Sequence, residues 1–118
     1  MIDFSKQITD DGIQLVRVAG DLLGGSNQYF FDCIQDEIET GQKHIVISFA
    51  DIGYVNSAGL GSLVRARARV SSLGGTVYLA QIENKLIDLF SILNFDKIFN
   101  IFPTECEAVE AIRKRVYC

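Results

Sequence analysis

Residues 44–49 (His-Ile-Val-Ile-Ser-Phe) form a short, almost continuous apolar run. A run of this kind is typical of a β-strand that is buried on both faces, as the strands of a parallel sheet are. Parallel strands need long crossover connections, and helical patterns precede and follow this run. Helices that alternate with strands in this way predict right-handed crossovers and a mostly parallel sheet.

The rest of the chain divides into segments with the periods of strands and helices. Strands are expected at residues 4–9, 13–19, 44–49, 76–80 and 98–102, and helices up to residue 39 and at residues 57–73, 84–93 and 104–115. Ser26 or Asn27 is expected to cap the first helix, and Thr104 the last, with Glu107 at the capping-box position. Glycines at 41 and 74–75 end the first two helices.

The first two expected strands are separated only by residues 10–12 (Asp-Asp-Gly), which are a turn signal. They should therefore pair as an antiparallel hairpin at one edge of the sheet. We predict a single α/β domain over residues 1–118, with a mostly parallel five-stranded sheet, an N-terminal antiparallel hairpin and four helices. Ligands and partners of such sheets usually meet the loops at the carboxyl ends of the strands.

The composition is that of an ordinary folded domain. Hydrophobic residues make up 48% of the 118 residues and charged residues 22%, which is enough apolar surface for a core without disulfides or metal. The formal net charge of −4 argues against nucleic-acid binding through bulk charge. No apolar run approaches the roughly 18 residues of a transmembrane span, and the first residues lack the pattern of a secretory signal.

The three cysteines, Cys33, Cys106 and Cys118, are scattered along the chain and form no CxxC pair. This pattern indicates reduced thiols, as in the cytosol. Together with the missing membrane span and secretory signal, it predicts a cytoplasmic protein that is not inserted in a membrane.

The sequence holds no constellation typical of an enzyme. The single histidine, His44, precedes an apolar strand, and no pattern supplies it with a nucleophile or an orienting group. Metal-site spacings such as HExxH and CxxC are absent. Gly59-x-Gly61 lacks the third glycine of a dinucleotide fingerprint and the lysine of a phosphate-binding P-loop. We therefore expect a protein that is not an enzyme and uses neither cofactor nor metal.

The most informative segment is residues 54–61 (Tyr-Val-Asn-Ser-Ala-Gly-Leu-Gly), where an expected loop meets a helix. Ser57 has two interpretations there. Its hydroxyl can cap the helix by accepting a backbone N–H of the first turn. Alternatively, Ser57 is exposed and phosphorylated, which would place roughly −1.5 to −2 charges at the positive end of the helix dipole. That charge is enough to abolish docking of an uncharged or acidic partner without unfolding the domain.

The segment resembles the STAS domain of the bacterial anti-sigma factor antagonist family, whose loop reads Asp-Ser-Ser/Thr-Gly-Leu-Gly with a phosphorylated first serine. The matching residues 56–61 read Asn-Ser-Ala-Gly-Leu-Gly, so the resemblance makes Ser57 the phosphorylation site. The resemblance covers nearly the whole chain. It includes residues 20–22 (Gly-Asp-Leu), 45–47 (Ile-Val-Ile), 74–75 (Gly-Gly), 86–90 and 94–95.

The resemblance implies a partner-switching protein with a STAS-like fold. Unphosphorylated members bind an anti-sigma factor, usually a serine kinase with a histidine-kinase-like ATPase fold, and thereby free a sigma factor. Phosphorylation of the serine blocks this binding, and a PP2C-type phosphatase restores it. Such a protein is a kinase substrate and a competitive inhibitor. We expect it neither to bind nucleic acid directly nor to insert in a membrane.

Three positions depart from the family pattern. Asn56 replaces the usual Asp, Ala58 replaces a second hydroxyl residue, and Leu23 replaces an acidic residue in a turn that usually reads Gly-Glu-Leu-Asp. Ser57 is therefore the only hydroxyl residue of the motif, and Asp21 occupies the family's Glu position. The missing acids favour a second hypothesis, a STAS scaffold that is never phosphorylated. An accessory subunit of a membrane transporter is a third.

The predicted partner-binding surface consists of residues near Ser57. It comprises Asn56, Ala58, Gly59, Leu60, Gly61, Asp21 and Arg65. Leu60 is either an exposed contact between two glycines or part of the core, and both interpretations stay open. Arg65 and Arg69 share one helix face, whereas Arg67 points elsewhere. The face with Arg65 is either solvated or steers an acidic patch of the partner.

Overall fold

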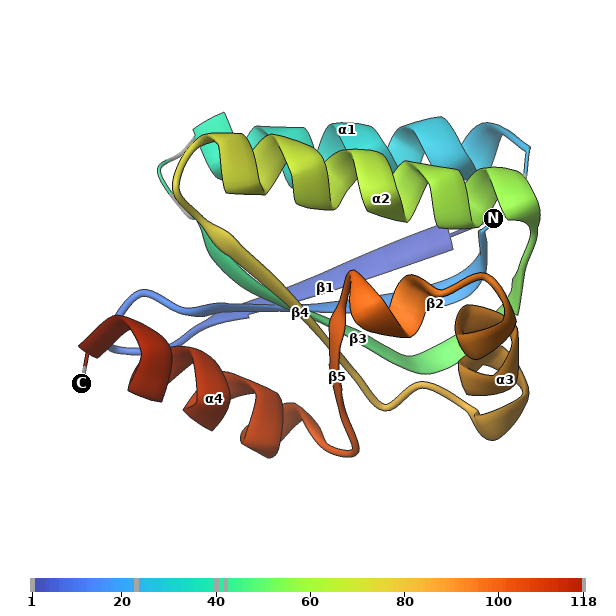
Figure 1. Ribbon diagram of the computed structural model, residues 1–118. Helices are drawn as coiled ribbons and strands as arrows, with labels where there is room; N and C mark the ends of the chain where they lie inside the picture. The colour runs from blue at the N-terminus through green and yellow to red at the C-terminus, as the bar shows by residue number, and fades with distance from the viewer. Residues whose placement is uncertain (1, 23, 40, 42, 118) are drawn as a thin grey trace.

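Five strands lie side by side in the order in which the chain forms them (Figure 1). They are β1 (Ile2–Ile8), β2 (Gln14–Leu22), β3 (His44–Val55), β4 (Thr76–Ala80) and β5 (Asn100–Phe102), in a computed structural model that describes residues 2–22, 24–39, 41 and 43–117. β1 and β2 pair antiparallel, and each later pair is parallel. The mostly parallel five-stranded sheet with an N-terminal antiparallel hairpin is therefore confirmed.

The described residues also form the four predicted α-helices. α1 (Gly25–Glu39) and α2 (Ser57–Ser72) lie side by side on one face of the sheet, and α4 (Glu105–Tyr117) lies on the other (Figure 1). α3 (Asn84–Ile92) and the 3-10 helix η1 (Phe95–Lys97) lie toward the end of the molecule where β3 stops. The α/β fold class is confirmed.

Side chains along β3 alternate between two apolar clusters, one on each face of the sheet. Ile45, Ile47 and Phe49 belong to the larger cluster beneath α1 and α2. Val46 belongs to the smaller cluster beneath α4, together with Ile112. All of these side chains are buried, so the apolar run of residues 44–49 is a strand covered on both faces, as predicted.

β3 continues well beyond the apolar run. Residues 51–55, expected to be a loop, extend the strand to Val55 and pair with the last residues of β2, so that Asp21 opposes Tyr54 and Leu22 opposes Val55. The sequence hid this extension because most of its side chains are exposed and carry no apolar alternation. The extension carries the end of β3 past β4, whose pairing with β3 stops at Ser48 and Ala80.

The start of α1 differs from the expected one. The helix begins at Gly25, so Ser26 and Asn27 both lie inside it and neither is its cap. Gly24 has a positive φ of 60°, a conformation that glycine adopts without strain, and its carbonyl accepts the Asn27 N–H at 3.2 Å. The polar pair therefore lies within the first turn of α1, and Gly24 precedes the helix.

β5 is shorter than predicted because its expected first residues belong to a different structure. Phe95–Lys97 form η1, and the Phe99 N–H donates to the Phe95 carbonyl at 2.9 Å, so the strand starts only at Asn100. Of the two apolar residues at the start of the expected strand, Ile98 is exposed, whereas Phe99 packs in the core. Phe99 is buried and contacts the rings of Phe90 and Phe95.

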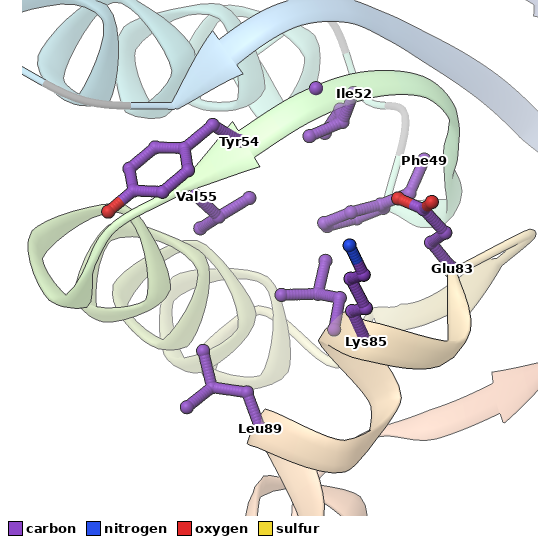
Figure 2. A pocket seen from close by; sticks show the side chains of 9 residues that line it. Phe49, Ile52, Tyr54, Val55, Glu83, Lys85 and Leu89 are labelled. Carbon is purple, nitrogen blue, oxygen red and sulfur yellow. The ribbon is translucent and has the colours of Figure 1, made fainter.

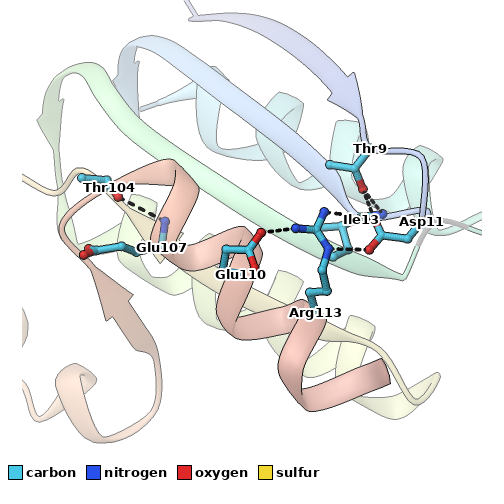
Figure 3. A network of polar contacts seen from close by, with 7 residues as sticks. All are labelled: Thr9, Asp11, Ile13, Thr104, Glu107, Glu110 and Arg113. Carbon is cyan, nitrogen blue, oxygen red and sulfur yellow. Dashed lines mark hydrogen bonds and ion pairs between the residues drawn. The ribbon is translucent and has the colours of Figure 1, made fainter. Parts of the chain in front are cut away.

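α4 is tied to the β1–β2 turn at the end of the sheet opposite the end of β3 (Figure 1, Figure 3). The Arg113 Nε donates to Asp11 Oδ2 at 2.6 Å, and Arg113 also pairs with Glu110. At the start of the helix, Thr104 Oγ1 accepts the Glu107 N–H at 3.1 Å, which confirms Thr104 as the cap. The contacts of Arg113 therefore lie at the opposite end of the sheet from the end of β3.

Candidate partner-binding site

Asn56 connects β3 to α2 and caps the helix. Its side-chain Oδ1 accepts the Gly59 N–H at 2.8 Å, and its backbone is extended, as an N-cap residue requires. Its own N–H donates to the Leu22 carbonyl at 3.2 Å, which ties the connection to the end of β2. The cap interpretation of Ser57 is therefore wrong, because the preceding asparagine fills that role.

Ser57 is the first residue of α2 and is exposed. Its hydroxyl is not required for the cap, so the position can be modified without opening the first turn. That turn holds no acidic side chain. A phosphate on Ser57 would lie at the positive end of the dipole of a 16-residue helix, where negative charge is stabilised.

Gly59 and Gly61 have different environments. A Cβ on Gly59 would lie 2.6 Å from the Leu22 carbonyl oxygen and 2.9 Å from Val55 Cγ1, so only glycine lets the helix approach the strands so closely. A Cβ on Gly61 would meet nothing within 4 Å, and Gly61 is exposed. Gly59 therefore serves the packing of α2, whereas the surface at Gly61 is open to a docking protein.

Leu60 belongs to the core. Its side chain is only 1% exposed and packs in the cluster beneath α2. Of its two interpretations, exposed contact and core residue, the structure supports the second. The side chains that the motif offers to a partner are therefore those of Ser57 and the exposed Ala58, with the bare backbone of Gly61 beside them.

Asp21 lies at the same end of the sheet as Ser57. It is exposed near the end of β2, opposite Tyr54, and its Oδ1 lies 2.8 Å from where a Cβ on Gly53 would be. The glycine therefore makes room for the carboxylate beside the last residues of β3. The family's acidic position at Leu23 lies outside the described residues.

Arg65 faces α1, two turns along α2 from Ser57. Its guanidinium carbon lies 4.2 Å from the centre of the Phe31 ring, and the Arg69 Nε donates to Gln35 Oε1 at 3.3 Å. The two arginines thus share a face, as the helical spacing predicts, while Arg67 reaches toward Phe99 on another face. Arg65 is still exposed, so a partner can reach its charge.

Asn27 is a site residue that sequence reasoning did not place. It is 7% exposed, and its Nδ2 donates to Asn56 Oδ1 at 3.4 Å, so it contacts the capping residue from beneath. Its spacing to Phe30 and Ile34, three and seven residues on, puts it on the apolar face of α1. That spacing was the available signal for a buried polar side chain.

A pocket of about 240 Å³ opens between the end of β3 and α3 (Figure 2). Its walls are apolar, and its edge carries polar and charged side chains. It is lined by Phe49, Ile52, Gly53, Tyr54, Val55, Glu83, Lys85, Leu86 and Leu89. Val55 directly precedes Asn56, so the pocket adjoins the Ser57 turn. Its two walls lie about 30 residues apart in sequence, which is why no motif revealed it.

Two features are absent from the residues that the structure describes. No group of three or more His, Cys, Asp or Glu side chains there could hold a metal ion. No helix within those ranges is long and apolar enough to cross a lipid bilayer.

The sequence profile of the STAS domain family matches residues 6–108, which is most of the chain. The protein belongs to the STAS domain family. The predicted resemblance to STAS domains is thereby confirmed, and the Ser57 turn occupies the loop that carried it.

This STAS domain is similar along most of its length to proteins from Thermotoga maritima. A Thermotoga maritima protein, named as a candidate anti-sigma factor antagonist, is 29% identical over 114 residues, covering 95% of this chain and 99% of its own length. The crystal structure of a Thermotoga maritima protein described in the same terms superimposes with a TM-score of 0.83 at 28% identity, covering 93% and 94% of the two chains.

A more distant structure shares the fold. It is the Bacillus cell fate determinant SpoIIAA in its phosphorylated form, with a TM-score of 0.73 at 18% identity, covering 94% of this chain and all of that one. At this identity the likeness concerns the fold alone. It shows that the same layers of strands and helices exist in a protein that carries a phosphate.

Proposed function

We propose that this STAS domain is an anti-sigma factor antagonist that is switched by phosphorylation of Ser57. The observation that carries the proposal is that Asn56 caps the start of α2 and leaves Ser57 exposed. The relative named as a candidate anti-sigma factor antagonist, similar along nearly its whole length, supports the same role.

In the unmodified state, the exposed surface around Ser57 binds an anti-sigma factor that is also a serine kinase. This complex keeps the anti-sigma factor away from its sigma factor. Ala58 and Gly61 are exposed beside the serine and let the partner approach the helix closely. Asp21 and Arg65, both exposed, contribute charges to this surface.

Phosphorylation then releases the partner. The Ser57 Oγ attacks the γ-phosphorus of ATP, ADP leaves, and the hydroxyl proton passes to solvent or to a kinase base. The product adds roughly −1.5 to −2 charges and three acceptor oxygens at the surface. Because the phosphate lies at the positive end of α2, the fold tolerates it while docking is lost. A PP2C-type phosphatase hydrolyses the phosphoserine and restores binding.

On this proposal the protein acts by binding and not by catalysis, and it needs no cofactor. It works in the cytoplasm, where a sigma factor meets RNA polymerase. It does not insert in a membrane, and it does not contact nucleic acid directly, because its effect on transcription passes entirely through the anti-sigma factor.

The first test is a phosphorylation-site measurement by mass spectrometry. The purified protein is incubated with lysate of its own organism and ATP, alongside the variants Ser57→Ala and Ser71→Ala. Ser71 is a matched control because it is an exposed serine near the other end of the same helix. We expect one phosphoryl group on Ser57 in the unaltered protein and in Ser71→Ala, and none in Ser57→Ala.

A lysate with active kinases that leaves Ser57 unmodified would contradict the switch. The constitutive scaffold would then be the better hypothesis. In that case the Ser57 surface still binds a partner, and the charge-mimicking variant Ser57→Asp would weaken that binding without any phosphorylation in the cell.

A further inference from the structure

The pocket between β3 and α3 continues the surface around Ser57. We propose that it receives an apolar anchor side chain, such as Phe or Leu, from the anti-sigma factor that docks at Ser57; this inference rests on the proposed function. The pocket is thus part of one interface with the phosphorylation site rather than a separate ligand site.

The first argument is continuity. Ile52 and Val55 form the β3 side of the pocket, and the chain passes from Val55 through Asn56 directly to Ser57 (Figure 2). A specific protein–protein interface buries about 800 Å² on each partner. Since Gly59 and Leu60 are buried, the exposed part of the motif is far too small for such an area. The partner must extend over neighbouring residues.

The volume of the pocket indicates what kind of group it binds. Pockets that bind small-molecule ligands measure about 300–1,000 Å³, and this one, at about 240 Å³, is smaller. A single large side chain is the better match. Interfaces concentrate their binding energy on such anchors, which insert into desolvated pockets near the centre of the contact.

The chemistry of the pocket agrees with this occupant. Phe49, Leu86 and Leu89 line it with apolar side chains, while the exposed Glu83 and Lys85 contribute charge. Neither charged side chain belongs to an ion pair in the described part of the chain. An apolar centre with a charged rim is the usual anatomy of a protein–protein interface.

α3 itself exposes more apolar surface than a solvent-facing helix normally does. Five of its nine residues are apolar, namely Leu86, Ile87, Leu89, Phe90 and Ile92, yet only Phe90 is buried. Ile92 is 76% exposed, and across the pocket Tyr54 is 57% exposed. Helices that are apolar on most sides are normally covered, and contiguous exposed apolar surface marks an interaction site.

The test compares two substitutions to tryptophan on one helix. Leu89→Trp fills the pocket, whereas Ser91→Trp places the same ring at an exposed polar position of α3 that does not line the pocket. The probe is the purified serine-kinase anti-sigma factor of the same organism, titrated by calorimetry without ATP so that no phosphoryl donor is present. Ser57→Asp is measured in parallel as the readout of the proposed function.

We expect Leu89→Trp to weaken binding at least tenfold, with Ser91→Trp within threefold of the unaltered protein. Thermal unfolding first shows that each variant is folded, and Ile52→Trp, which fills the pocket from β3, replaces Leu89→Trp if that variant is not. Pocket variants that bind normally, or an equal loss in Ser91→Trp, would overturn the anchor proposal.

The outcomes separate this inference from the function on which it rests. If Ser57→Asp loses binding while the pocket variants keep it, the switch stands and the anchor proposal falls. If the pocket variants lose binding and Ser57→Asp does not, the anchor stands and the switch falls. If the unaltered protein binds no such kinase, both fall.

Discussion

Asn56 and Ser57 are adjacent residues with separate tasks. Asn56 holds the Gly59 N–H and the end of β2, so it determines where α2 starts. Ser57 is one residue further on and contributes its hydroxyl to the surface. The two tasks would conflict in a single serine, because a capping oxygen that carries a phosphate can no longer hold the first turn in the same way.

This separation predicts opposite results for two alanine substitutions. Asn56→Ala should lower the free energy of unfolding by about 0.5–2 kcal/mol because the first turn of α2 loses its cap. Ser57→Ala should change it by no more than about 0.5 kcal/mol, as surface substitutions do. Urea denaturation of both variants measures the difference. Asn56→Asp, which keeps an acceptor oxygen, is the control and should retain most of the stability.

At the scale of elements, the position of α2 depends on one close approach. Gly59 lies against the Leu22 carbonyl and the Val55 side chain, where no Cβ fits. Because Ser57 is two residues away on the same turn, the contact that packs the helix also fixes where the proposed phosphorylation site is presented. Asn27 completes this arrangement from α1 through its contact with Asn56.

The two glycines of α2 therefore give a matched pair of predictions. Gly59→Ala should destabilise the protein by roughly 1–3 kcal/mol, because the added methyl group must displace the helix from the strands. Gly61→Ala should stabilise it by up to about 1 kcal/mol, because its Cβ meets nothing and alanine favours helix. Thermal or urea unfolding of both variants tests this. Equal effects would show that the close approach at Gly59 is not what positions α2.

The elements differ in how far sequence could predict them. The apolar run predicted the strand at residues 44–49, and glycines predicted the helix ends at Gly41 and Gly74. The extension of β3 did not, since pairing with β2 rather than burial maintains it. Leu60 could have been assigned to the core, because it recurs with Leu63 and Val70 at helical spacing. The pocket could not, because its walls meet only in the folded chain.

At the scale of the whole molecule, the two ends of the sheet have different characters. The end with the β1–β2 turn is held by charged contacts, such as those of Arg113 with Asp11. The other end presents Ser57, the pocket and the apolar surface of α3. Protonation of side chains at the end with the β1–β2 turn should therefore change the free energy of unfolding. Substitutions at the end with Ser57 and the pocket should change partner binding.

The protein should lose stability in acid in two steps. The pKa of His44 lies below its usual 6.5 because burial disfavours the imidazolium, and Lys43 and Arg115 repel it. The pKa of Glu105 lies below its usual 4.5 because Arg17 donates hydrogen bonds to its carboxylate. For both groups the unfolded chain binds a proton at higher pH than the folded one, so stability falls as pH drops.

The first step should begin below about pH 6.5 and the second below about pH 4.5, the usual pKa values of the two groups. Urea denaturation at a series of pH values between 8 and 3.5 measures both steps. His44→Gln, which carries no charge at any pH, should abolish the first step and leave the second. If the first loss of stability persists in this variant, a group other than His44 causes it.

The cap at Asn56 also bears on how the proposed regulation can change over evolution. Because α2 starts correctly without the Ser57 hydroxyl, a lineage can replace the serine and lose the proposed response to a kinase while the domain keeps its shape. The residue found at this position in a related gene therefore reports on whether that pathway is regulated, and is independent of the demands of folding.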